Sequence, residues 1–432
     1  MTSSQQQQQQ QQKLQQQSQI VAQPSVLSFL LRSIGLSSAP LTNTSLLQNV
    51  VVIGAGFGGA TLCKGLEKQP GISVTLIEPR DFLLNKFGAL RAAAQGGKWS
   101  TDVLLPIASI LKNTKHVQAK ATRIDSSNKN VLCDNGETVS YDVLVICSGS
   151  RNFSPGEPPS HARTMESAKA YWRELAASFA SGKRFAVVGT GPVAIEMVGE
   201  IRLANPTAEV SLLASNYKLL GSVVPAFAPK HVAYIEEQLA ALNIKVESGD
   251  PVVSPQPPKR ENQLKAPPII SDCTVTFQSG KTKKFDALVF ALGAVSQASG
   301  FCPAEWLDAS TGEVLIDELF RVKGAGSSGN VFCFGDAAQI LKRSKMGFWA
   351  TNDAELVLAN ILAVIKGKAP TQKVQMPRGP LMLLPIGDKH GILVAAYGWI
   401  FLGNKVASSL KGKDLAAPKV WDKFGLKVPG PG

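Results

Sequence analysis

Two glycine-rich segments carry the most specific chemical signal in this chain of 432 residues. The first is Gly54-Ala-Gly-Phe-Gly-Gly59, directly after the apolar residues 50–53, and the second is Gly189-Thr-Gly-Pro-Val-Ala194, directly after residues 185–188. A strand that ends in such a turn and continues as a helix holds the pyrophosphate of a dinucleotide at the helix N-terminus. Two of these turns in one chain predict two bound dinucleotides, which is what moving hydride from a nicotinamide to a flavin requires.

Three glycines of the first turn have separate structural roles. Gly54 permits the tight turn, Gly56 lets the backbone approach a pyrophosphate, and Gly59 lets the helix pack against the strand. An acid, Glu78, ends the next predicted strand, where a carboxylate accepts hydrogen bonds from a ribose. The predicted first nucleotide site therefore consists of Gly54, Ala55, Gly56, Phe57, Gly58, Gly59 and Glu78.

The second turn predicts a nicotinamide nucleotide site made by Gly189, Gly191 and Ala194. The strand that follows it, residues 209–213, ends without an acid, so no carboxylate repels a 2′-phosphate, and Lys218 is placed to contact one. We therefore expect NADPH to be accepted beside NADH.

Two acids extend the predicted site. Glu196 lies one helical turn beyond the second glycine turn and is predicted to face the junction of the two cofactors, where it orients the nicotinamide or pairs with a lysine beside the flavin. An exposed helix glutamate is the alternative. Asp336 follows the apolar residues 331–334 and is predicted to meet the ribityl hydroxyls of the flavin, a position that also suits a helix N-cap.

The segments around these motifs alternate between strand and helix patterns. Strands are predicted at residues 48–53, 73–77, 113–125, 130–133, 141–146, 185–188, 209–213, 245–247 and 287–291. Helices are predicted at residues 58–69, 167–180, 192–204 and 225–242. Strands separated by helices imply parallel sheets covered on both faces, and the Pro- and Lys-rich residues 251–268 predict a mobile loop.

The predicted fold class is therefore α/β, with two Rossmann-like dinucleotide-binding domains, namely an FAD domain and an inserted NAD(P) domain, plus a small C-terminal domain. The predicted boundaries are residues 1–46 for a disordered or targeting segment, 47–165 and 296–370 for the two parts of the FAD-binding domain, 166–295 for the NAD(P)-binding domain, and 371–432 for a segment that covers the flavin and faces a membrane interface.

The composition fits a globular protein without a dithiol relay. A hydrophobic content of 44% is ordinary for a chain with a real core. The six cysteines include no close pair, and Cys63, Cys147 and Cys333 lie in apolar runs typical of buried thiols. This pattern argues against electron transfer from a flavin to a protein disulfide, so the acceptor is expected to meet the flavin directly.

Both ends of the chain are biased in composition, and the net charge is +13. The glutamine-rich residues 1–19 predict disorder, and the acid-free residues 26–36 suit part of a mitochondrial transit peptide or an interfacial helix.

Residues 391–403 are apolar and followed by lysines, which suits a bilayer interface; a core strand and helix over the flavin is the alternative. We expect a cytoplasmic protein with peripheral membrane association, and the mitochondrion is the alternative location.

Several stretches resemble flavoproteins of the pyridine nucleotide-disulfide oxidoreductase fold. Within them, the chain is most similar to the apoptosis-inducing-factor homologues of the ferroptosis-suppressor branch, relatives of type II NADH dehydrogenases. The specific stretches are Asn85-Lys-Phe-Gly-Ala-Leu-Arg91-Ala, residues 187–197, Gly335-Asp336 followed by Lys345-Met346, and Leu383-Leu-Pro-Ile-Gly387.

The resemblance implies non-covalent FAD, NAD(P)H as the donor and a quinone as the acceptor. It implies FAD contacts from Arg91, the backbone near Ala121 and Asp336, and it implies that Lys345 lies beside the isoalloxazine ring. Two alternatives stay open, namely that Arg91 forms an ion pair within the protein and that Lys345 is a surface loop cation. Residues 347–353 do not reproduce the glutamine-containing quinone-site pattern of type II NADH dehydrogenases, so the quinone expectation depends on the resemblance.

The expected function is that of an FAD-dependent NAD(P)H:quinone oxidoreductase with Glu196 and Lys345 at the reactive centre, peripheral membrane contact through the C-terminal segment, and a homodimer left open. One rival is a soluble NAD(P)H reductase of a protein or of monodehydroascorbate, since a basic surface suits an acidic partner. Another is a redox-sensing flavoprotein that binds nucleic acid or a membrane. No nucleic acid is expected, because the chain shows no aromatic-basic stacking pattern.

Overall fold

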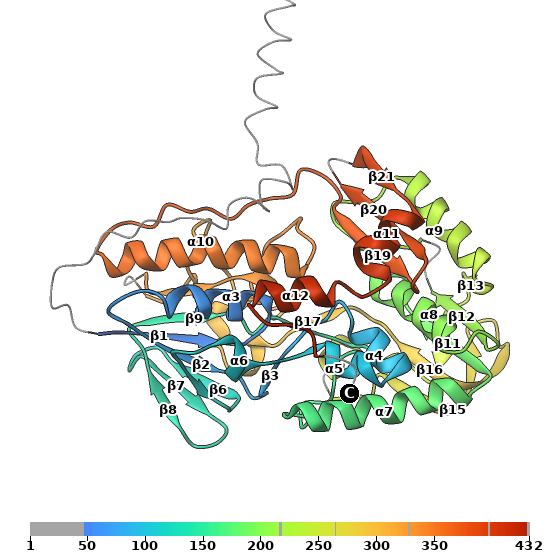
Figure 1. Cartoon of the computed structure of the whole chain (residues 1–432), viewed down its shortest axis with the longest axis horizontal. Coiled ribbons are helices and arrows are strands. Elements are labelled where there is room, and N and C mark those ends of the chain that lie inside the picture. The colour runs from blue at the N-terminus through green and yellow to red at the C-terminus, as the bar shows by residue number, and fades with distance from the viewer. Residues whose placement is uncertain (1–46, 216–217, 264, 327–328, 396–397, 430–432) are drawn as a thin grey trace, which may run out of the picture. The chain divides into compact units, whose positions relative to one another are not determined.

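The computed structural model describes residues 47–215, 218–263, 265–326, 329–395 and 398–429 (Figure 1). They belong to one compact unit that runs from Leu46 to the end of the chain. The predictions for residues 1–19 and 26–36 lie outside the described residues.

A five-stranded parallel sheet forms the first half of the structure, in the order β18-β9-β1-β2-β5. Its strands are β1 (Gln48–Ile53), β2 (Ile72–Ile77), β5 (Thr114–Val117), β9 (Val143–Ile146) and β18 (Val331–Cys333). Side chains alternate between its two faces. Val50 and Val52 pack under α3 (Phe57–Leu66) and α10 (Gly347–Ile365), which lie side by side over this face (Figure 1), whereas Val51 and Ile53 pack with Trp306 on the other.

A six-stranded sheet forms the second half, in the order β13-β12-β11-β16-β15-β14. Four strands are parallel neighbours, namely β11 (Arg184–Val188), β12 (Glu209–Ala214), β13 (Ile244–Ser248) and β16 (Thr282–Phe290). The antiparallel strands β15 (Ile269–Phe277) and β14 (Val252–Ser254) complete it. The helices around this sheet are α7 (Met165–Ser181), α8 (Pro192–Ala204) and α9 (Pro229–Ala241).

Both halves confirm the predicted α/β class with parallel sheets, and three local predictions are wrong. The strand predicted at residues 113–125 is two strands, because Thr114–Val117 pairs in the parallel sheet and Ala121–Asp125 pairs in a separate antiparallel sheet. Residues 251–268 are not a loop throughout, because Val252–Ser254 pairs with β15 and Arg260–Asn262 forms a 3-10 turn. The helix predicted from residue 225 begins at Pro229, where proline occupies the first turn without losing a hydrogen bond. The predicted domain boundaries stay predictions.

Short elements join the two sheets. The chain leaves the first sheet through β10 (Ser150–Asn152) and returns through β17 (Ala294–Ser296), and these two strands pair with each other. The remaining short elements lie in the chain between strands of the first sheet; they are β3 (Phe82–Leu84), β4 (Leu104–Pro106), α4 (Ala89–Gln95), α5 (Lys98–Asp102), α6 (Ile107–Ile110), and the meander β6 (Ala121–Asp125), β7 (Asn130–Cys133) and β8 (Thr138–Ser140).

The C-terminal segment forms a third, antiparallel sheet of β19 (Met382–Ile386), β20 (His390–Ala395) and β21 (Ile400–Leu402). Leu384, Ile386, Ile392 and Val394 are buried in the same core as α8. Residues 391–403 therefore supply strands, as the core-strand alternative requires, although Trp399 remains largely exposed. After α11 (Asn404–Ala407) and a π-helical turn (Ser408–Gly412), α12 (Ala417–Lys423) packs into the core of the first sheet.

One helix of the described residues, α10, is long and apolar enough by length and composition to cross a membrane. Its buried side includes Asp353, which pairs with Arg343, and Asn360, which bonds the backbone of residues 371 and 372. Helices that cover the sheet of a soluble protein pass the same test, and α10 covers a sheet here.

A buried ion pair links helix α4 to helix α8 of the second half. Arg91 of α4 donates from Nε to Glu200 Oε2 of α8 at 2.7 Å and from a second guanidinium nitrogen to Oε1 at 2.9 Å. Both side chains are almost fully buried, and Arg91 also donates to the backbone oxygen of Lys413. The fork-shaped pairing is the strong geometry for a guanidinium and a carboxylate.

Replacing Glu200 with Gln is expected to lower the free energy of unfolding by about 3–5 kcal/mol, because the guanidinium of Arg91 would remain buried without a counter-charge. The exposed pair Glu209–Lys245 offers a matched control, in which Glu209→Gln should cost about 1 kcal/mol or less. Denaturant titration of wild type, Glu200→Gln and Glu209→Gln measures the free energy of unfolding. An equal decrease in the two variants would contradict a special stabilising role of the Arg91–Glu200 pair.

Candidate functional site

The first glycine turn lies where β1 ends, and its packing leaves two glycines no room for a side chain. A Cβ on Gly54, whose φ is +106°, would lie 2.7 Å from the backbone oxygen of Cys147, and one on Gly59 would lie 1.9 Å from the oxygen of Gly54. A Cβ on Gly56 would meet nothing within 4 Å. The turn is therefore tight against the protein at its ends and open at its centre.

The second glycine turn repeats this plan at the end of β11. A Cβ on Gly189 would lie 2.5 Å from the backbone oxygen of Ala291, Gly191 has open space within 4 Å, and Ala194 is fully buried. Gly56 and Gly191 are the N-caps of α3 and α8, and neither helix start has a side-chain cap. Backbone N–H groups at an uncapped helix start, beside open space, suit a phosphate.

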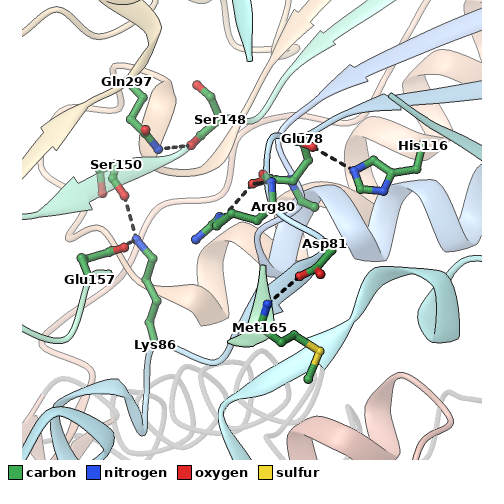
Figure 2. Close-up of polar contacts among 11 residues, drawn as sticks. Glu78, Arg80, Asp81, Lys86, His116, Ser148, Ser150, Glu157, Met165 and Gln297 are labelled. Carbon is green, nitrogen blue, oxygen red and sulfur yellow. Dashed lines mark hydrogen bonds and ion pairs between the residues drawn. The ribbon is translucent and has the colours of Figure 1, made fainter. Parts of the chain in front are cut away.

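Glu78 lies beside the first turn at the end of β2 (Figure 2). Its carboxylate accepts hydrogen bonds from Ala55 N at 2.9 Å and from Arg80 Nε at 2.7 Å. Burial would raise the pKa of Glu78, but the charge and hydrogen bonds of Arg80 and the N–H of Ala55 lower it below its ordinary value. The carboxylate is thus ionised and fixed to the turn, while its ribose contact stays a prediction.

A polar group that the sequence did not predict surrounds the exits of β9 and β10 (Figure 2). Lys86 donates to Ser150 O at 2.7 Å and forms an ion pair with the buried Glu157, and Gln297 donates to Ser148 O at 3.1 Å. Ser148 Oγ is buried and has no hydrogen-bond partner among the described residues. A buried hydroxyl without a partner costs free energy, so this site suits a ligand that supplies one.

Asp336 and Lys345 lie together at the end of β18. Asp336 is in the 3-10 turn Gly335–Ala337, and its Oδ2 accepts a hydrogen bond from Ser150 Oγ at 2.8 Å. Lys345 donates to the backbone oxygen of Asp336 and pairs with Glu313 at 2.8 Å. Lys345 is therefore an ion-paired residue of this site, with 29% of its side chain exposed.

Glu196 pairs with a lysine, but the lysine is Lys411. The two charged groups are 2.7 Å apart, and both side chains are mostly buried. The ammonium of Lys411 also lies 5.4 Å from the ring centroid of Phe87, which stacks on Phe57 of the first glycine turn at 5.0 Å. The pair thus connects α8 of the second turn with aromatic rings of the first, and the alternative of an exposed glutamate is wrong.

Of the remaining predicted residues, Arg91 lies close to this pair, because its partner Glu200 is one helical turn from Glu196. Arg91 is held by Glu200, so the ion-pair alternative describes its contacts, and a flavin contact from Arg91 stays a prediction. Ala121 is buried at the start of β6, beside Cys133. Lys411 was missed because it comes from the π-helical turn Ser408–Gly412, a rare conformation that is frequent at functional sites.

All six cysteines lie in the described residues and are free thiols. Cys63, Cys147 and Cys333 are buried, as predicted. Burial raises the pKa of Cys147 and of Cys333 well above the ordinary value, so both thiols are neutral and neither offers a reactive thiolate.

Comparisons with known proteins agree with this geometry. Residues 48–355 match the family described as pyridine nucleotide-disulphide oxidoreductase. Ferroptosis suppressor protein 1 of Taeniopygia guttata is 26% identical over 88% of this chain and 96% of its own length. NDH2 from Plasmodium falciparum, solved in complex with NADH, has a TM-score of 0.62 at 16% identity and covers 84% of this chain and 93% of its own. The sulfide:quinone oxidoreductase from Aquifex aeolicus has a TM-score of 0.60 at 17% identity, with 88% and 95% covered.

Gly56→Ala is expected to weaken binding of a flavin nucleotide at least about tenfold, which is about 1.4 kcal/mol, because the new methyl group enters the open space of the turn. Stability of the protein without ligand should not change. Gly300, which also has open space and an ordinary φ, gives the control Gly300→Ala. Flavin absorbance reports how much nucleotide is bound, and thermal melting reports the stability of the protein. A Gly56→Ala protein that is fully loaded with flavin would contradict the proposed site.

The stability contributed by Glu78 should depend on pH. Because its folded pKa is lowered below the ordinary 4.5, the stabilisation is complete above pH 4.5 and is lost as the pH falls through the folded pKa. The difference in unfolding midpoint between wild type and the Glu78→Gln variant should therefore become smaller as the pH falls below 4.5. The exposed Glu318→Gln is the control, and a difference that is the same at pH 7 and pH 3 would refute this assignment.

Proposed function

This chain belongs to the pyridine nucleotide-disulphide oxidoreductase family, and from that membership we propose that it transfers two electrons from NAD(P)H, through non-covalent FAD, to a quinone. The observation that carries the proposal is the pair of glycine turns, each open at its centre and each at the uncapped start of a helix. They belong to two different parallel sheets, so each sheet offers its own dinucleotide site.

The residues present fit both nucleotides. Gly54–Gly59, Glu78 and Asp336 would hold FAD, and the unpartnered Ser148 Oγ lies at the exit of the strand next to β1. Gly189, Gly191 and Ala194 would hold the nicotinamide nucleotide, and the absence of an acid after β12 leaves room for the 2′-phosphate of NADPH. When bound, the isoalloxazine of FAD accepts two electrons from a nicotinamide and passes them on.

The Glu196–Lys411 pair is the proposed positioning device between the two nucleotides. Glu196 projects from the first turns of α8, directly beyond the second glycine turn, and Lys411 reaches the Phe87–Phe57 rings beside the first. A carboxylate held by one fixed ammonium has little freedom to rotate, so it can orient the carboxamide of the nicotinamide. Lys345 lies beside Asp336 and Glu313, and its place beside the isoalloxazine ring stays a prediction.

The free thiols favour an external acceptor. A disulfide relay passes electrons through a reactive thiolate, whereas burial raises the pKa of Cys147, near Gly54, well above the ordinary value. The acceptor therefore has to approach the flavin itself, and a quinone is the acceptor class that the resemblance implies. We further propose peripheral membrane contact through the C-terminal segment and a cytoplasmic location, with self-association left open.

Steady-state turnover tests this function. The purified protein should oxidise NADPH or NADH rapidly when a soluble ubiquinone analogue is added and slowly without it. Monodehydroascorbate and an oxidised iron–sulfur protein serve as comparison acceptors. If the protein turns over with either comparison acceptor and not with the quinone, the proposed acceptor is wrong, although the protein is still a flavoenzyme.

Glu196→Gln should slow reduction of the bound flavin by NADPH about tenfold or more, because the neutral amide no longer holds the Lys411 ammonium and the donor is misplaced. Reoxidation by the quinone should change much less. Lys411→Met should give the same pattern, and Glu209→Gln, an exposed glutamate, should leave both steps intact. Rapid mixing under anaerobic conditions measures the two steps separately, and an equal loss in both would count against a positioning role.

A further inference from the structure

Lys86 is a charged residue of the site to which the proposed function gives no role. It lies in the short segment between β3 and α4. Its ammonium donates to Ser150 O at 2.7 Å and forms an ion pair with Glu157, and Figure 2 shows both contacts at the start of β10. The side chain of Lys86 is 36% exposed, whereas that of Glu157 is 9% exposed. A buried carboxylate and a backbone oxygen therefore fix the position of a cation that solvent or a ligand can still reach.

The contacts of Lys86 extend to both predicted nucleotide sites. Lys86 and Glu157 line one small cavity together with Val193, a residue of the second glycine turn. On the other side, Ser150, which accepts the hydrogen bond from Lys86, donates from its Oγ to Asp336 Oδ2 at 2.8 Å. Lys86 therefore lies between the acid that is predicted to hold the flavin and the turn that is predicted to hold the nicotinamide nucleotide.

The ionised groups around Lys86 leave an excess of positive charge. Burial would raise the pKa of Glu157, but nearby cations lower it below its ordinary value. These cations are Lys86, Arg80 and Arg151. Arg80 is also paired with the ionised Glu78, so three cations and two carboxylates together give one net positive charge. Such a group of charges favours a ligand that carries or gains negative charge.

An unsatisfied hydroxyl at the same place indicates that a polar ligand binds there. Ser148 Oγ is buried and has no hydrogen-bond partner among the described residues, and Ser148 is two positions before Ser150. Because a buried polar group without a partner costs free energy, this observation supports a ligand at the exit of β9 independently of the charges.

We propose that Lys86, held by Glu157 and Ser150, stabilises the negative charge that a bound flavin gains on reduction and thereby raises its reduction potential. A hydride carries two electrons and one proton, so its transfer to a neutral flavin adds one negative charge and leaves the oxidised nicotinamide with one positive charge. A cation that is fixed before this transfer stabilises the new charge without reorganisation. The proposal rests on the proposed function in one respect, because it takes Asp336 and the first glycine turn to hold the flavin.

Redox titration of the flavin-loaded protein against a reference dye tests this proposal without a nicotinamide or a quinone. Lys86→Met removes the cation and leaves Glu157 beside two other cations. Glu157→Gln removes the acid and leaves Lys86 bonded to Ser150 O. The exposed pair of Lys245 and Glu209 gives the matched controls Lys245→Met and Glu209→Gln.

Lys86→Met should lower the equilibrium constant for flavin reduction about tenfold, which makes the potential of the two-electron couple about 30 mV more negative. Glu157→Gln should shift the potential in the opposite direction, because the charge that it removes has the opposite sign. Lys86→Arg, which keeps the charge, should resemble wild type, and so should both controls. A role in structure alone predicts no such opposition, since either variant breaks the same ion pair.

Two results overturn the proposal. The first is a potential of Lys86→Met equal to that of wild type, and the second is a shift of the same sign in Lys86→Met and Glu157→Gln. If Lys86→Met retains no flavin, Glu157→Gln decides, and a potential at or below that of wild type overturns the proposal.

This inference and the proposed acceptor fail separately. A protein that reduces no quinone but shows the opposite shifts would keep the role of Lys86 and lose the proposed acceptor. A protein that reduces the quinone but shows no shift would keep the proposed function and lose the role of Lys86. A wild-type protein that binds no flavin would contradict both.

Discussion

Two ion-paired carboxylates on successive turns of α8 connect this helix to the first half of the protein and to the C-terminal segment. Glu200 is paired with Arg91 of α4, and Glu196 is paired with Lys411 of the C-terminal π-helical turn. A buried charge is tolerated only with its partner in place, so α8 fits the first half of the protein and the C-terminal segment in one arrangement. Because α8 also begins at the second glycine turn, the same two pairs fix where that turn lies relative to the first glycine turn.

The C-terminal segment therefore has two roles that depend on different side chains. Its inner residues pack on α8, and Gly199 allows this because a Cβ there would lie 2.5 Å from the backbone N of Gly387. Its π-helical turn supplies Lys411 to the pair with Glu196. Helix α12 then packs into the core of the first sheet through Trp421, whose indole donates to Asp102 O at 2.8 Å. At the edge strand β21, the large apolar side chains of Trp399, Ile400 and Leu402 remain exposed.

Strands β1 and β11 and the glycine turns that follow them could be predicted from the sequence because their signals are local. An apolar run followed by Gly-x-Gly is set by sterics within a few residues, and Glu78 follows at the end of the next strand. The pairing of Glu196 with Lys411 spans 215 positions, and no local pattern indicates which of the many lysines closes it. Lys345, which the resemblance places beside the isoalloxazine ring, pairs with Glu313 and donates to the backbone oxygen of Asp336.

Among the elements that were not predicted, two were missed for different physical reasons. Strand β14 lies in a Pro- and Lys-rich stretch whose composition favours a loop, and pairing with β15 outweighs that local preference. Helix α10 carries Asp353 and Asn360 on its buried side, which breaks the apolar stripe expected of a covering helix. Arg343 and the backbone of residues 371 and 372 satisfy these two side chains.

The most direct test of the account is sequential anaerobic mixing of the purified protein, first with NADPH and then with a soluble ubiquinone analogue, while the flavin absorbance is followed. The account predicts rapid bleaching by the nucleotide and rapid recovery on addition of the quinone. A protein without flavin absorbance, or one whose flavin is not bleached by NADPH or NADH, would contradict the claim that the two glycine turns bring a nicotinamide to a flavin.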